Sequence, residues 1–254
     1  MTTSASFAPP TAVVTGAAGG IGEALVLAFH QAGYEVIASD VVARPCALPC
    51  TDYIQADLAR VVADEAYADT IFRAIRGRLD GRGLDALINN AAIQILGGAE
   101  SLTRVDWHRT LDVNLLAPFL FAQALLAQLE AARGCVLNIS SIHARLTKKN
   151  FVAYATSKAA LSGMTRALAV DLGPRVRVNA IEPAAIATKM LQEGFSGKPT
   201  SYRQLQDCHP LQRIGQATEL AELALAIAGG GMDFLHGACV GLDGGIGARL
   251  FDPA

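Results

Sequence analysis

The amino-acid sequence predicts an α/β protein in which helices cover both faces of a single doubly wound parallel sheet. Short runs of aliphatic or β-branched residues alternate with amphipathic helical segments, which is typical of successive strand–helix–strand units. The chain has 254 residues and 52% of them are hydrophobic, enough for a large core. Since no repeat or linker-like stretch divides the sequence, we expect one domain over residues 11–254, preceded by a flexible leader at residues 1–10.

In the first half of the chain, strands and helices alternate as far as residue 129. Buried aliphatic runs predict strands at residues 12–14, 35–39, 52–56 and 84–88. Helical periodicity predicts helices at residues 21–32, 61–79 and 107–129, and Gly33 is placed to end the first of them. Two prolines within residues 41–50 leave room for only a short crossover helix, or for none.

The second half of the chain continues the alternation. We expect strands at residues 135–139, 176–181 and 238–242, and helices at residues 154–172 and 218–228. Between them, residues 189–209 are weakly patterned and carry Gly194, Gly197 and Pro199. Connections of this length are often substrate lids, so we expect a lid here that is mobile without a ligand.

Charge and composition argue against several classes of protein. The formal net charge is −2, with 21 basic and 23 acidic residues spread evenly, so we expect no nucleic-acid or membrane partner. The first basic residue is Arg44, which argues against a secretory leader. The longest apolar stretch, residues 115–127, is too short to span a bilayer. We therefore expect a cytoplasmic protein.

The cysteines give no sign of a disulfide framework or a metal site. There are five, an odd number, and without a secretory signal this favours free, buried thiols in a reducing compartment. Cys46 and Cys50 could form a redox pair or supply two metal ligands. No second ligand pair has matching spacing, so we expect no metal.

A glycine-rich turn, Thr15–Gly22 (TGAAGGIG), is expected between the first strand and the first helix. Gly16 permits a sharp turn, whereas Gly20 and Gly22 let a pyrophosphate and the neighbouring strand come close. The N-terminus of the following helix favours the phosphate charge. An ordinary glycine-rich loop needs no such spacing, so the segment predicts a Rossmann-type dinucleotide site.

Asp40, at the end of the second expected strand, indicates which dinucleotide binds. A carboxylate there can accept hydrogen bonds from the ribose 2′-hydroxyl of NAD. At about 4 Å it would repel the 2′-phosphate of NADP by roughly 1 kcal/mol per charge in water, and by about 4 kcal/mol at an intermediate dielectric. Arg44 is near enough in sequence to offset part of this repulsion, although a solvated loop arginine is the commoner outcome. We expect NAD as the cofactor, with NADP disfavoured.

Two further turns follow strands at the carboxyl edge, where open α/β sheets bind ligands. Asp57 and Leu58 come after the third strand and could hold an adenine ring by polar and apolar contacts. Asn90 and Ala91 come after the fourth strand, within the sequence NNAA. Small polar residues are also ordinary turn formers, so these positions gain weight only from the other motifs.

The sequence Tyr154-Ala-Thr-Ser-Lys158 predicts a proton-transferring group. A spacing of four residues places both side chains on one face of a helix. A neighbouring ammonium stabilises phenolate, and lowering a phenol pKa from ~10 to ~7 needs roughly 4 kcal/mol. Such a tyrosine can exchange a proton with an alcohol at neutral pH. Ser141 and Asn114 lie upstream and complete the candidate set.

These motifs, in this order, resemble those of the short-chain dehydrogenase/reductase family in its compact, single-domain, NAD(P)-dependent form. The resemblance extends from about Thr11 to Gly245. It is carried by TGAAGGIG, NNAA, Asn114, the 13-residue step from Ser141 to Tyr154, and the sequence Arg177-Val178-Asn179-Ala180 with Pro183 and Thr188. It implies hydride transfer between nicotinamide and a secondary alcohol or ketone.

The resemblance also implies a role for each candidate. Tyr154 would be the general acid/base, and Lys158 would lower its pKa and bind the nicotinamide ribose. Ser141 would polarise the substrate oxygen, and Asn114 would hold a water that links Lys158 to a proton relay. The cofactor would contact Gly16, Gly20, Ile21, Gly22, Asp40, Asp57, Leu58, Asn90, Ala91, Tyr154, Lys158, Pro183, Ile186 and Thr188.

Three alanines stand where the family has glycine: Ala92, Ala144 and Ala184. A methyl group strains any such position whose backbone needs a positive φ. We expect small backbone shifts and a slightly narrower pocket, with catalysis retained.

The substrate and the assembly are less closely defined. Gln94, His143, Glu182 and His209 could line a polar pocket for a small sugar, polyol or hydroxy acid, although each also has an ordinary structural explanation. Wide apolar faces on the helices at residues 107–129 and 154–172 predict a homodimer or homotetramer.

Two alternatives stay open at this point. The first is an epimerase or dehydratase with tightly held NAD, although such relatives usually carry an extra C-terminal substrate region. The second is a non-catalytic dinucleotide sensor or scaffold, which would have no need of the complete set Asn114, Ser141, Tyr154 and Lys158.

Overall fold

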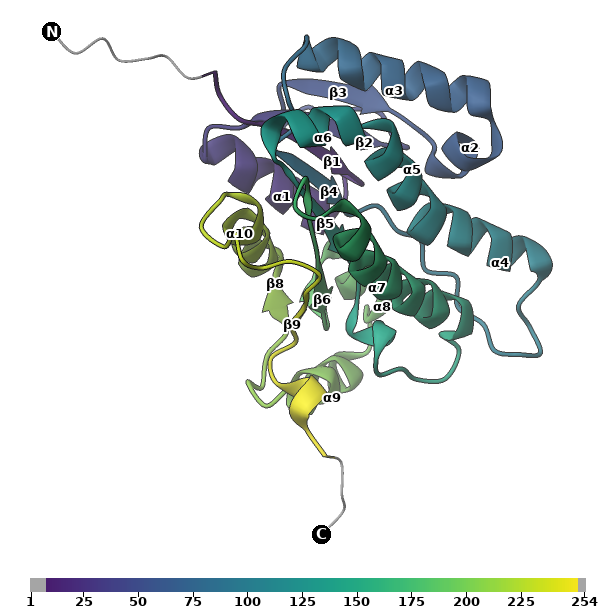
Figure 1. The fold of residues 1–254 in the computed structure, drawn as a ribbon. Coiled ribbons are helices and arrows are strands. Elements are labelled where there is room, and N and C mark those ends of the chain that lie inside the picture. Colours follow the sequence, from purple (N-terminus) through teal and green to yellow (C-terminus); the bar gives the residue numbers. More distant parts are fainter. Residues whose placement is uncertain (1–7, 251–254) are drawn as a thin grey trace, which may run out of the picture.

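Seven parallel strands form one sheet in the order β3-β2-β1-β4-β5-β6-β9 (Figure 1). The computed structural model describes residues 8–250, so most of the expected leader lies outside the described part of the chain. The strands are β1 (Thr11–Thr15), β2 (Glu35–Asp40), β3 (Asp52–Gln55), β4 (Ala86–Asn89), β5 (Cys135–Ile139), β6 (Arg177–Pro183) and β9 (Cys239–Leu242). The strand order reverses between β1 and β4, so the predicted doubly wound parallel sheet is confirmed.

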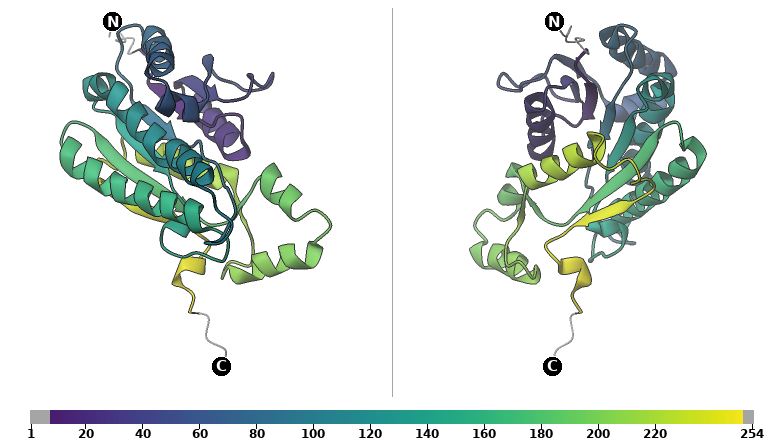
Figure 2. Two further views of the ribbon diagram at one scale, coloured as in Figure 1. Left: turned by 90° about the vertical axis from the view of Figure 1, so that its right-hand side faces the viewer. Right: turned by 60° about the vertical axis from the view of Figure 1, so that its left-hand side comes forward.

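Helices cover both faces of this sheet (Figure 2). On one face α1 (Gly20–Gln31) packs against α10 (Ala217–Ala228), and Leu25, Phe29 and Leu220 are fully buried between them and the strands. The other face is covered by α2 (Leu58–Ala63), α3 (Glu65–Leu79), α5 (Ala117–Ala124), α6 (Leu126–Ala132) and α7 (Val152–Leu172). The strands are therefore buried on both sides, as their continuous apolar runs predict.

The helix expected at residues 61–79 is two helices, α2 and α3. Asp64 leaves the helical conformation, with φ −132° and ψ 100°, and its carboxylate accepts a hydrogen bond from Tyr67 N at 3.0 Å. A side chain that caps a helix in this way starts a new one. Hydrophobic periodicity continues across the break, and for that reason it did not reveal the break.

The helix expected at residues 107–129 is four shorter pieces. They are α4 (Arg104–Leu111), the π-helix η1 (Asp112–Leu116), α5 and α6. The axis turns by 61° at the break between Arg104–Ala124 and Leu126–Ala132, where Leu125 has φ −107° and ψ 10°. Within residues 8–250 no single helix has the length and apolarity to cross a membrane, and only this bent pair passes that test, on length and composition alone.

The segment at residues 189–209 contains two helices, α8 (Lys189–Gly194) and α9 (Pro199–Cys208). The sequence predicts a lid here but no helices, because Gly197 and Pro199 interrupt the pattern. A second sheet, which the sequence did not predict, pairs β7 (Ile186–Ala187) with β8 (Gly215–Gln216) and joins the two ends of the segment. Residues 41–50 contain no helix, and Gly33 has φ +86°, both as expected.

Candidate active site

The glycine-rich turn packs so closely that two of its glycines, Gly16 and Gly22, leave no space for a side chain. A Cβ on Gly22 would lie 1.9 Å from Gly16 O, and one on Gly16, which has φ +64°, would lie 2.7 Å from Ala91 Cα. Gly19 and Gly20 are exposed, and Gly19 begins α1 without a side-chain hydrogen bond to its N-terminal amides. Backbone amides left uncapped at a helix N-terminus fit the pyrophosphate of a dinucleotide.

Asp40 ends β2 beside this turn. Its Oδ2 accepts a hydrogen bond from Ala18 N at 2.9 Å and its Oδ1 accepts one from Val42 N at 3.3 Å. The carboxylate is therefore held next to the dinucleotide turn, at the position that the sequence predicts. Arg44 is exposed in the loop after β2, as expected of a solvated arginine, and its guanidinium also donates to Leu48 O at 3.3 Å and to Cys50 O at 2.9 Å.

Asp57 and Leu58 lie where β3 passes into α2. Asp57 Oδ1 caps that helix, accepting from Ala59 N at 2.9 Å and Arg60 N at 3.4 Å. Leu58 is only 8% exposed and belongs to the core. Both residues thus have a structural task, and their contacts with adenine stay a prediction.

The NNAA turn is bonded directly to the glycine turn. Thr15 Oγ1 accepts from the backbone amides of Asn90 and Ala91 at 3.1 and 3.2 Å. The side-chain amide of Asn90 donates to Thr15 O at 3.0 Å and to Gly16 O at 2.9 Å. Asn90 therefore holds the carboxyl ends of β1 and β4 together at the point where the strand order reverses, which is where open α/β sheets bind ligands.

Tyr154 and Lys158 lie one turn apart near the start of α7, as the sequence predicts. The Lys158 ammonium is 5.8 Å from the centre of the Tyr154 ring and donates to Ile139 O, at the end of β5, at 2.7 Å. Ser141, which follows β5 and precedes η2 (Ile142–Ala144), is buried, and its hydroxyl hydrogen-bonds Tyr154. The three candidate catalytic side chains therefore meet at the carboxyl end of the sheet.

The pKa values of this group are set by burial. Burial lowers the pKa of Lys158 to about 7, and burial raises the pKa of Tyr154 while the Ser141 hydrogen bond lowers it in part. The sequence led us to expect Lys158 to depress the tyrosine pKa. The structure instead raises the Tyr154 pKa. Burial would strengthen an ammonium–phenolate pair, but it also favours the neutral forms of both groups.

Asn114 lies in the π-helix η1 and is fully buried. Its side chain accepts from Ile93 N at 2.8 Å and donates to Ile93 O at 2.9 Å, and it also donates to Ser157 Oγ at 3.0 Å. Asn114 thus joins the loop after β4 to α7, one residue before Lys158. Ser157 is an anchor that the sequence analysis missed, although it lies inside the Tyr–Lys motif.

His143 closes one side of the group. Its ring stacks on Phe151 with centroids 4.4 Å apart and meets the Tyr154 ring edge-on at 5.7 Å. Burial, with a smaller contribution from the positive charge of Lys148, lowers the pKa of His143 to about 4. The imidazole is therefore neutral at pH 7 and able to exchange hydrogen bonds with a polar ligand.

The remaining cofactor candidates lie on the segment that leads to the lid. Pro183 ends β6, Ile186 is 6% exposed in the core, and Thr188 caps α8 by accepting from Leu191 N at 3.2 Å. A Cβ on Gly20 would meet Thr188 Cβ at 3.3 Å, so the base of the lid touches the start of α1. Ile21, in the first turn of α1, is half-buried. The structure therefore brings this segment to the dinucleotide turn.

The three alanines in place of glycine cause no backbone strain. In the described part of the chain the non-glycine residues with positive φ are Asp80, Arg133, Asn150 and Gln212. Ala92, Ala144 and Ala184 are not among them, so their methyl groups need no left-handed backbone.

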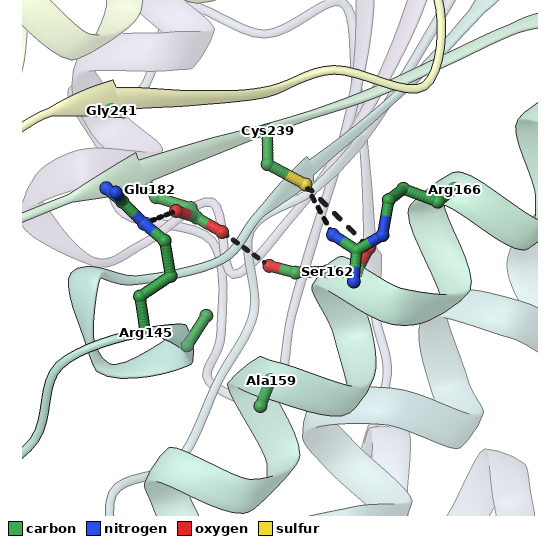
Figure 3. A pocket seen from close by; sticks show the side chains of 8 residues that line it. Arg145, Ala159, Ser162, Arg166, Glu182, Cys239 and Gly241 are labelled. Carbon is green, nitrogen blue, oxygen red and sulfur yellow. Dashed lines mark hydrogen bonds and ion pairs between the residues drawn. The ribbon is translucent and has the colours of Figure 1, made fainter.

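Three other residues were candidates for the substrate pocket: Gln94, Glu182 and His209. His209 is buried at the end of α9, with its Nδ1 2.8 Å from Leu205 O. Gln94 is exposed in the loop after β4. Glu182 is buried on β6, where Arg145 Nε donates to its Oε2 at 2.6 Å and Ser162 Oγ donates to its Oε1 at 2.8 Å (Figure 3). Both carboxylate oxygens have protein partners, so the geometry does not favour Glu182 as a ligand for a substrate hydroxyl.

The cysteines are free, but they are not all buried as expected. Cys50 and Cys135 are buried, Cys208 and Cys239 are partly exposed, and Cys46 is exposed in the loop after β2. A proline-rich crossover without a helix has no apolar face to cover that side chain. Among residues 8–250 no group of three or more histidine, cysteine or acidic side chains could hold a metal ion.

The fold and the site define a class of protein. A doubly wound sheet with an uncapped glycine turn at its strand reversal is the framework of a dinucleotide-binding enzyme. A half-buried tyrosine with a buried lysine and serine at the same edge provides a proton donor or acceptor beside the dinucleotide position. The combination is that of an oxidoreductase acting on alcohols or carbonyls.

Comparisons with known proteins agree with this class. A short-chain dehydrogenase family model, described as enoyl-(acyl carrier protein) reductase, matches residues 16–247. Trans-4-hydroxycyclohexanecarboxylate dehydrogenase of Sinomonas cyclohexanicum is 32% identical over 94% of this chain and 93% of its own. Aldohexose dehydrogenase of Thermoplasma acidophilum, in ligand-free form, has a TM-score of 0.87 at 30% identity, covering 97% of both chains. A Beutenbergia cavernae structure with NADP at low occupancy has a TM-score of 0.86 at 28% identity, covering 96% of this chain and 98% of its own.

The chain therefore belongs to the short-chain dehydrogenase/reductase family. It is an NAD(P)-binding oxidoreductase that acts on CH–OH groups of small molecules. Of the functions considered from the sequence, these relatives favour an oxidoreductase over an epimerase or dehydratase and over a non-catalytic dinucleotide sensor.

Proposed function

We propose that the protein is an NAD-dependent dehydrogenase of a small, polar, hydroxylated secondary alcohol. Its general acid/base is Tyr154, assisted by Ser141, Lys158 and Asn114. The observation that carries the proposal is the meeting of the Tyr154 phenol, the Ser141 hydroxyl and the Lys158 ammonium at the carboxyl end of the sheet. Strands from both halves of the chain belong to one sheet whose carboxyl edge carries the site. We therefore propose that residues 11–254 form one domain, with a lid at residues 189–209.

When bound, the nicotinamide ring of the cofactor supplies or accepts a hydride at its C4 carbon. The protein manages the proton on the substrate oxygen. In the reduction direction, Tyr154 donates its phenolic proton, and the raised pKa of this group keeps the proton in place at neutral pH. In the oxidation direction the same oxygen accepts the alcohol proton, and a protonated Lys158 stabilises the tyrosinate from within the same helix turn. Ser141 orients the substrate oxygen through its hydroxyl.

Lys158 and Asn114 hold this apparatus in place. Lys158 is tied to the end of β5 through Ile139 O, which fixes its ammonium at the carboxyl edge of the sheet, where the cofactor ribose would lie. Asn114 fixes both backbone groups of Ile93 and leaves the loop after β4 aligned with α7. We propose that a water held beside Asn114 links Lys158 to solvent, as the family resemblance implies.

Two observations support NAD over NADP. The Asp40 carboxylate is fixed at the end of β2 by Ala18 N, so a 2′-phosphate placed there would meet a negative charge. The guanidinium of Arg44, which could have offset that charge, is engaged by the carbonyls of Leu48 and Cys50. The Beutenbergia cavernae relative has NADP bound, so the preference needs a direct test.

The test compares kcat/KM for NAD and NADP in the wild-type enzyme and in Asp40→Ser. We expect at least a tenfold preference for NAD in the wild type, since about 1.4 kcal/mol of repulsion corresponds to a factor of ten. The preference should shrink in Asp40→Ser, which removes the charge but keeps a hydrogen-bonding side chain. An equal or higher kcat/KM with NADP in the wild type would overturn the assignment.

The substrate class follows from the polar groups near Tyr154. The neutral imidazole of His143 meets the Tyr154 ring, and the Ser141 hydroxyl hydrogen-bonds the phenol oxygen. Relatives act on a cyclic hydroxy acid and on aldohexoses, by their names, and both are small hydroxylated molecules. We therefore propose a sugar, polyol or hydroxy acid, with Gln94 and His143 as candidate substrate contacts.

The decisive experiment is a screen of sugars, polyols, hydroxy acids and cyclic alcohols with NAD and NADP, read as NAD(P)H absorbance at about 340 nm. It should include trans-4-hydroxycyclohexanecarboxylate and D-glucose. Tyr154→Phe should bind NADH normally and lose turnover by about three orders of magnitude, because it lacks only the proton-carrying oxygen. Absence of turnover across the panel with both cofactors, or an active Tyr154→Phe variant, would contradict the proposal.

We further propose a homodimer or homotetramer in the cytoplasm. The outer faces of α4, α5 and α7 expose Val105, Phe119 and Val170, which an assembly would cover. All five cysteines are free thiols, which a reducing compartment preserves. Subcellular fractionation tests the location, and the oligomer is tested below.

A further inference from the structure

Glu182 is a charged side chain buried almost completely in the sheet. Its side chain is 2% exposed, yet it follows directly on the apolar stretch of β6 that leads to the site. Burial of a lone carboxylate is strongly unfavourable, so its partners are essential to the fold of this region. The partners are Arg145 Nε at 2.6 Å and Ser162 Oγ at 2.8 Å.

Arg145 connects three elements that border the active site. It follows η2, so it belongs to the same loop as Ser141 and His143. Its guanidinium binds Glu182 on β6 and lies 3.9 Å from Asp243 Oδ2 in the turn after β9. That turn abuts the end of the lid, where a Cβ on Gly244 would lie 3.4 Å from the His209 ring.

The turn after β9 is shaped to receive this guanidinium. A Cβ on Gly241 would lie 3.4 Å from Arg145 Nη2, and one on Gly247 would lie 2.4 Å from Asp243 Oδ2. Asp243 Oδ1 also accepts from Gly245 N at 2.9 Å. Of these two positions, only Gly247 has no space for a Cβ, and glycine there lets the turn fold back against the Asp243 carboxylate.

The other oxygen of Glu182 leads back to the catalytic helix. Ser162 lies one turn beyond Lys158 on α7, and its hydroxyl is 2.8 Å from Ser140 Oγ. Ser140 Oγ also lies 3.1 Å from Lys158 O, and its single proton can be donated either there or to Ser162 Oγ. With that proton on Ser162 Oγ, Glu182 is linked through Ser162 to Ser140, the residue before Ser141.

A cavity of about 440 Å³ lies against this cluster, between the Arg145 loop, α7 and strands β6 and β9 (Figure 3). It leaves Arg145 half-exposed, with 50% of its side chain accessible, while Glu182 is sealed beneath it. The loop that carries Ser141 packs on the start of α7 through the stack of His143 on Phe151, and the ion pair with Glu182 ties it to β6.

From this we infer that the Arg145–Glu182 ion pair is a positioning device for catalysis: it fixes the Ser141–His143 loop against β6 and α7 so that Ser141 meets Tyr154. The inference rests on the proposed roles of Ser141 and Tyr154 and adds two positioning residues to them. Neither member of the pair needs to touch substrate. Because displacement of a catalytic group by about 1 Å can cost a hundredfold in rate, loss of the pair should act mainly on kcat.

The same strand offers a matched control. Arg175, just before β6, pairs with Glu130 of α6 at 2.5 Å, at the opposite end of the sheet. Their side chains are 49% and 35% exposed, so removing both charges leaves none buried. The double variant Arg175→Gln/Glu130→Gln should keep kcat and KM within twofold of the wild type.

The test uses the full-length enzyme, NAD and the panel alcohol with the highest kcat/KM. Glu182→Gln should lower kcat by roughly 10- to 100-fold, with KM changed less than threefold and the NADH dissociation constant within twofold. Arg145→Gln should do the same, whereas Arg145→Lys, which keeps the charge, should recover part of the rate. The double variant Arg145→Gln/Glu182→Gln should be faster than Arg145→Gln alone, because it leaves no buried carboxylate without its partner.

A purely structural role gives a different outcome. In that case Glu182→Gln would melt at a lower temperature but turn over within twofold of the wild type at 25 °C, and the inference would be wrong. The inference would be equally wrong if the losses of the two single variants multiplied in the double variant. If Glu182→Gln does not fold, Ser162→Ala removes one hydrogen bond of the cluster and should lower kcat by about threefold without changing NADH binding. Unchanged turnover in Ser162→Ala would then overturn the inference.

Different variants test the proposed function and this inference, so one can be refuted without the other. An active Tyr154→Phe variant removes the proposed acid/base, whatever Glu182 does. An inactive Tyr154→Phe variant beside fully active Arg145 and Glu182 variants leaves the proposed function standing and removes only the positioning device.

Discussion

Burial destabilises the protonated form of the Lys158 side chain. The side chain is 2% exposed, and burial brings its pKa from 10.5 to about 7. In the unfolded chain the same group stays protonated up to about pH 10.4. Between these two values the unfolded state binds the extra proton, so the native state gains stability as the pH rises. Below pH 7 the full cost of the buried ammonium is present, which amounts to about 3–5 kcal/mol.

We therefore predict that Lys158→Met stabilises the protein while it abolishes turnover. The melting temperature of the variant should exceed that of the wild type at pH 6, and the difference should shrink toward pH 10 as the wild-type lysine loses its cost. Loss of the hydrogen bond to Ile139 O offsets about 1 kcal/mol of the gain. Thermal melts of both proteins from pH 6 to pH 10 check this. A variant that melts below the wild type at pH 6 would show that the ammonium has partners strong enough to outweigh burial.

His143 should make the protein sensitive to acid. Its pKa is lowered from 6.5 to about 4, so between these values the unfolded chain binds a proton that the native state does not. Stability is therefore fully present above about pH 6.5 and falls as the pH drops toward 4, by about 1–3 kcal/mol once partial solvent screening is allowed for. His143→Phe keeps the ring stack on Phe151 and removes this titration. Urea unfolding at pH 7 and pH 4.5 should show a smaller loss for the variant than for the wild type, and an equal loss would refute the assignment.

At this scale the sequence reveals motif residues but not their partners. Tyr154, Lys158 and Ser141 were found because their spacing on a helix or after a strand is itself informative. The pairing of Arg145 with Glu182 joins residues 37 positions apart, and no local pattern encodes it. The direction of the Tyr154 pKa was missed for a related reason, since desolvation depends on what the complete fold packs around the group.

Among the elements, the π-helix η1 is the least regular and the most closely tied to the site. Asn114 sits inside it and forms three hydrogen bonds, two of them to the backbone of Ile93. π-Turns inside α-helices often occur at functional sites. Periodicity predicts one long helix here because a single wide turn shifts the apolar face by less than the pattern can resolve.

We predict that Asn114→Leu destabilises the protein by about 2–4 kcal/mol and lowers turnover at least tenfold. The substitution leaves the amide and carbonyl of the partly buried Ile93 without their partner, while the Ser157 hydroxyl keeps its bond to Tyr154 O. Gln123→Ala, on the exposed side of α5, is the control and should change stability by less than about 0.5 kcal/mol. Urea unfolding with both variants measures the difference. A loss no larger than that of the control would mean that the π-turn does not depend on this side chain.

Replacing glycine by alanine should have opposite effects in two of the helices. Gly22, in α1, leaves no space for a methyl group, because a Cβ would lie 1.9 Å from Gly16 O. Gly77, in α3, has nothing within 4 Å of the same position. Gly22→Ala should therefore displace the dinucleotide turn and weaken NADH binding at least tenfold, whereas Gly77→Ala should stabilise the protein by about 0.5–1 kcal/mol. Fluorescence titration with NADH and urea unfolding provide the two measurements, and normal NADH affinity in Gly22→Ala would contradict the close packing of the turn.

For the molecule as a whole, the sequence predicts the sheet well because parallel strands leave a strong signal. Each strand is buried on both faces, so its apolar run is continuous, and each crossover adds a helix of clear periodicity. The sequence does not reveal the small sheet of β7 and β8, whose strands have two residues each and no pattern of their own. The helices of the lid were missed because Gly194, Gly197 and Pro199 interrupt the helical pattern, although Thr188 supplies an N-terminal cap for the first of them.

Large apolar side chains are exposed on the outer surface of α4, α5 and α7. Val105 on α4, Phe119 on α5, and Val152 and Val170 on α7 are 72%, 37%, 42% and 87% exposed. α4 and α7 also pack against each other, so these apolar side chains lie on neighbouring elements of one layer. Apolar side chains gathered on one layer favour association with a second copy, since about 25 cal/mol is gained for each Å² of apolar surface removed from water.

We predict a dimer or tetramer at micromolar concentration, measured by size-exclusion chromatography with light scattering. Phe119→Glu combined with Val170→Glu should dissociate it, because each subunit would then bring two carboxylates into an apolar interface. Leu27→Glu is the matched control: this leucine is 41% exposed on α1, on the opposite face of the sheet, and its substitution should leave the mass unchanged. A wild-type monomer would contradict the predicted assembly. Dissociation by Leu27→Glu alone would place the interface on the α1–α10 face instead.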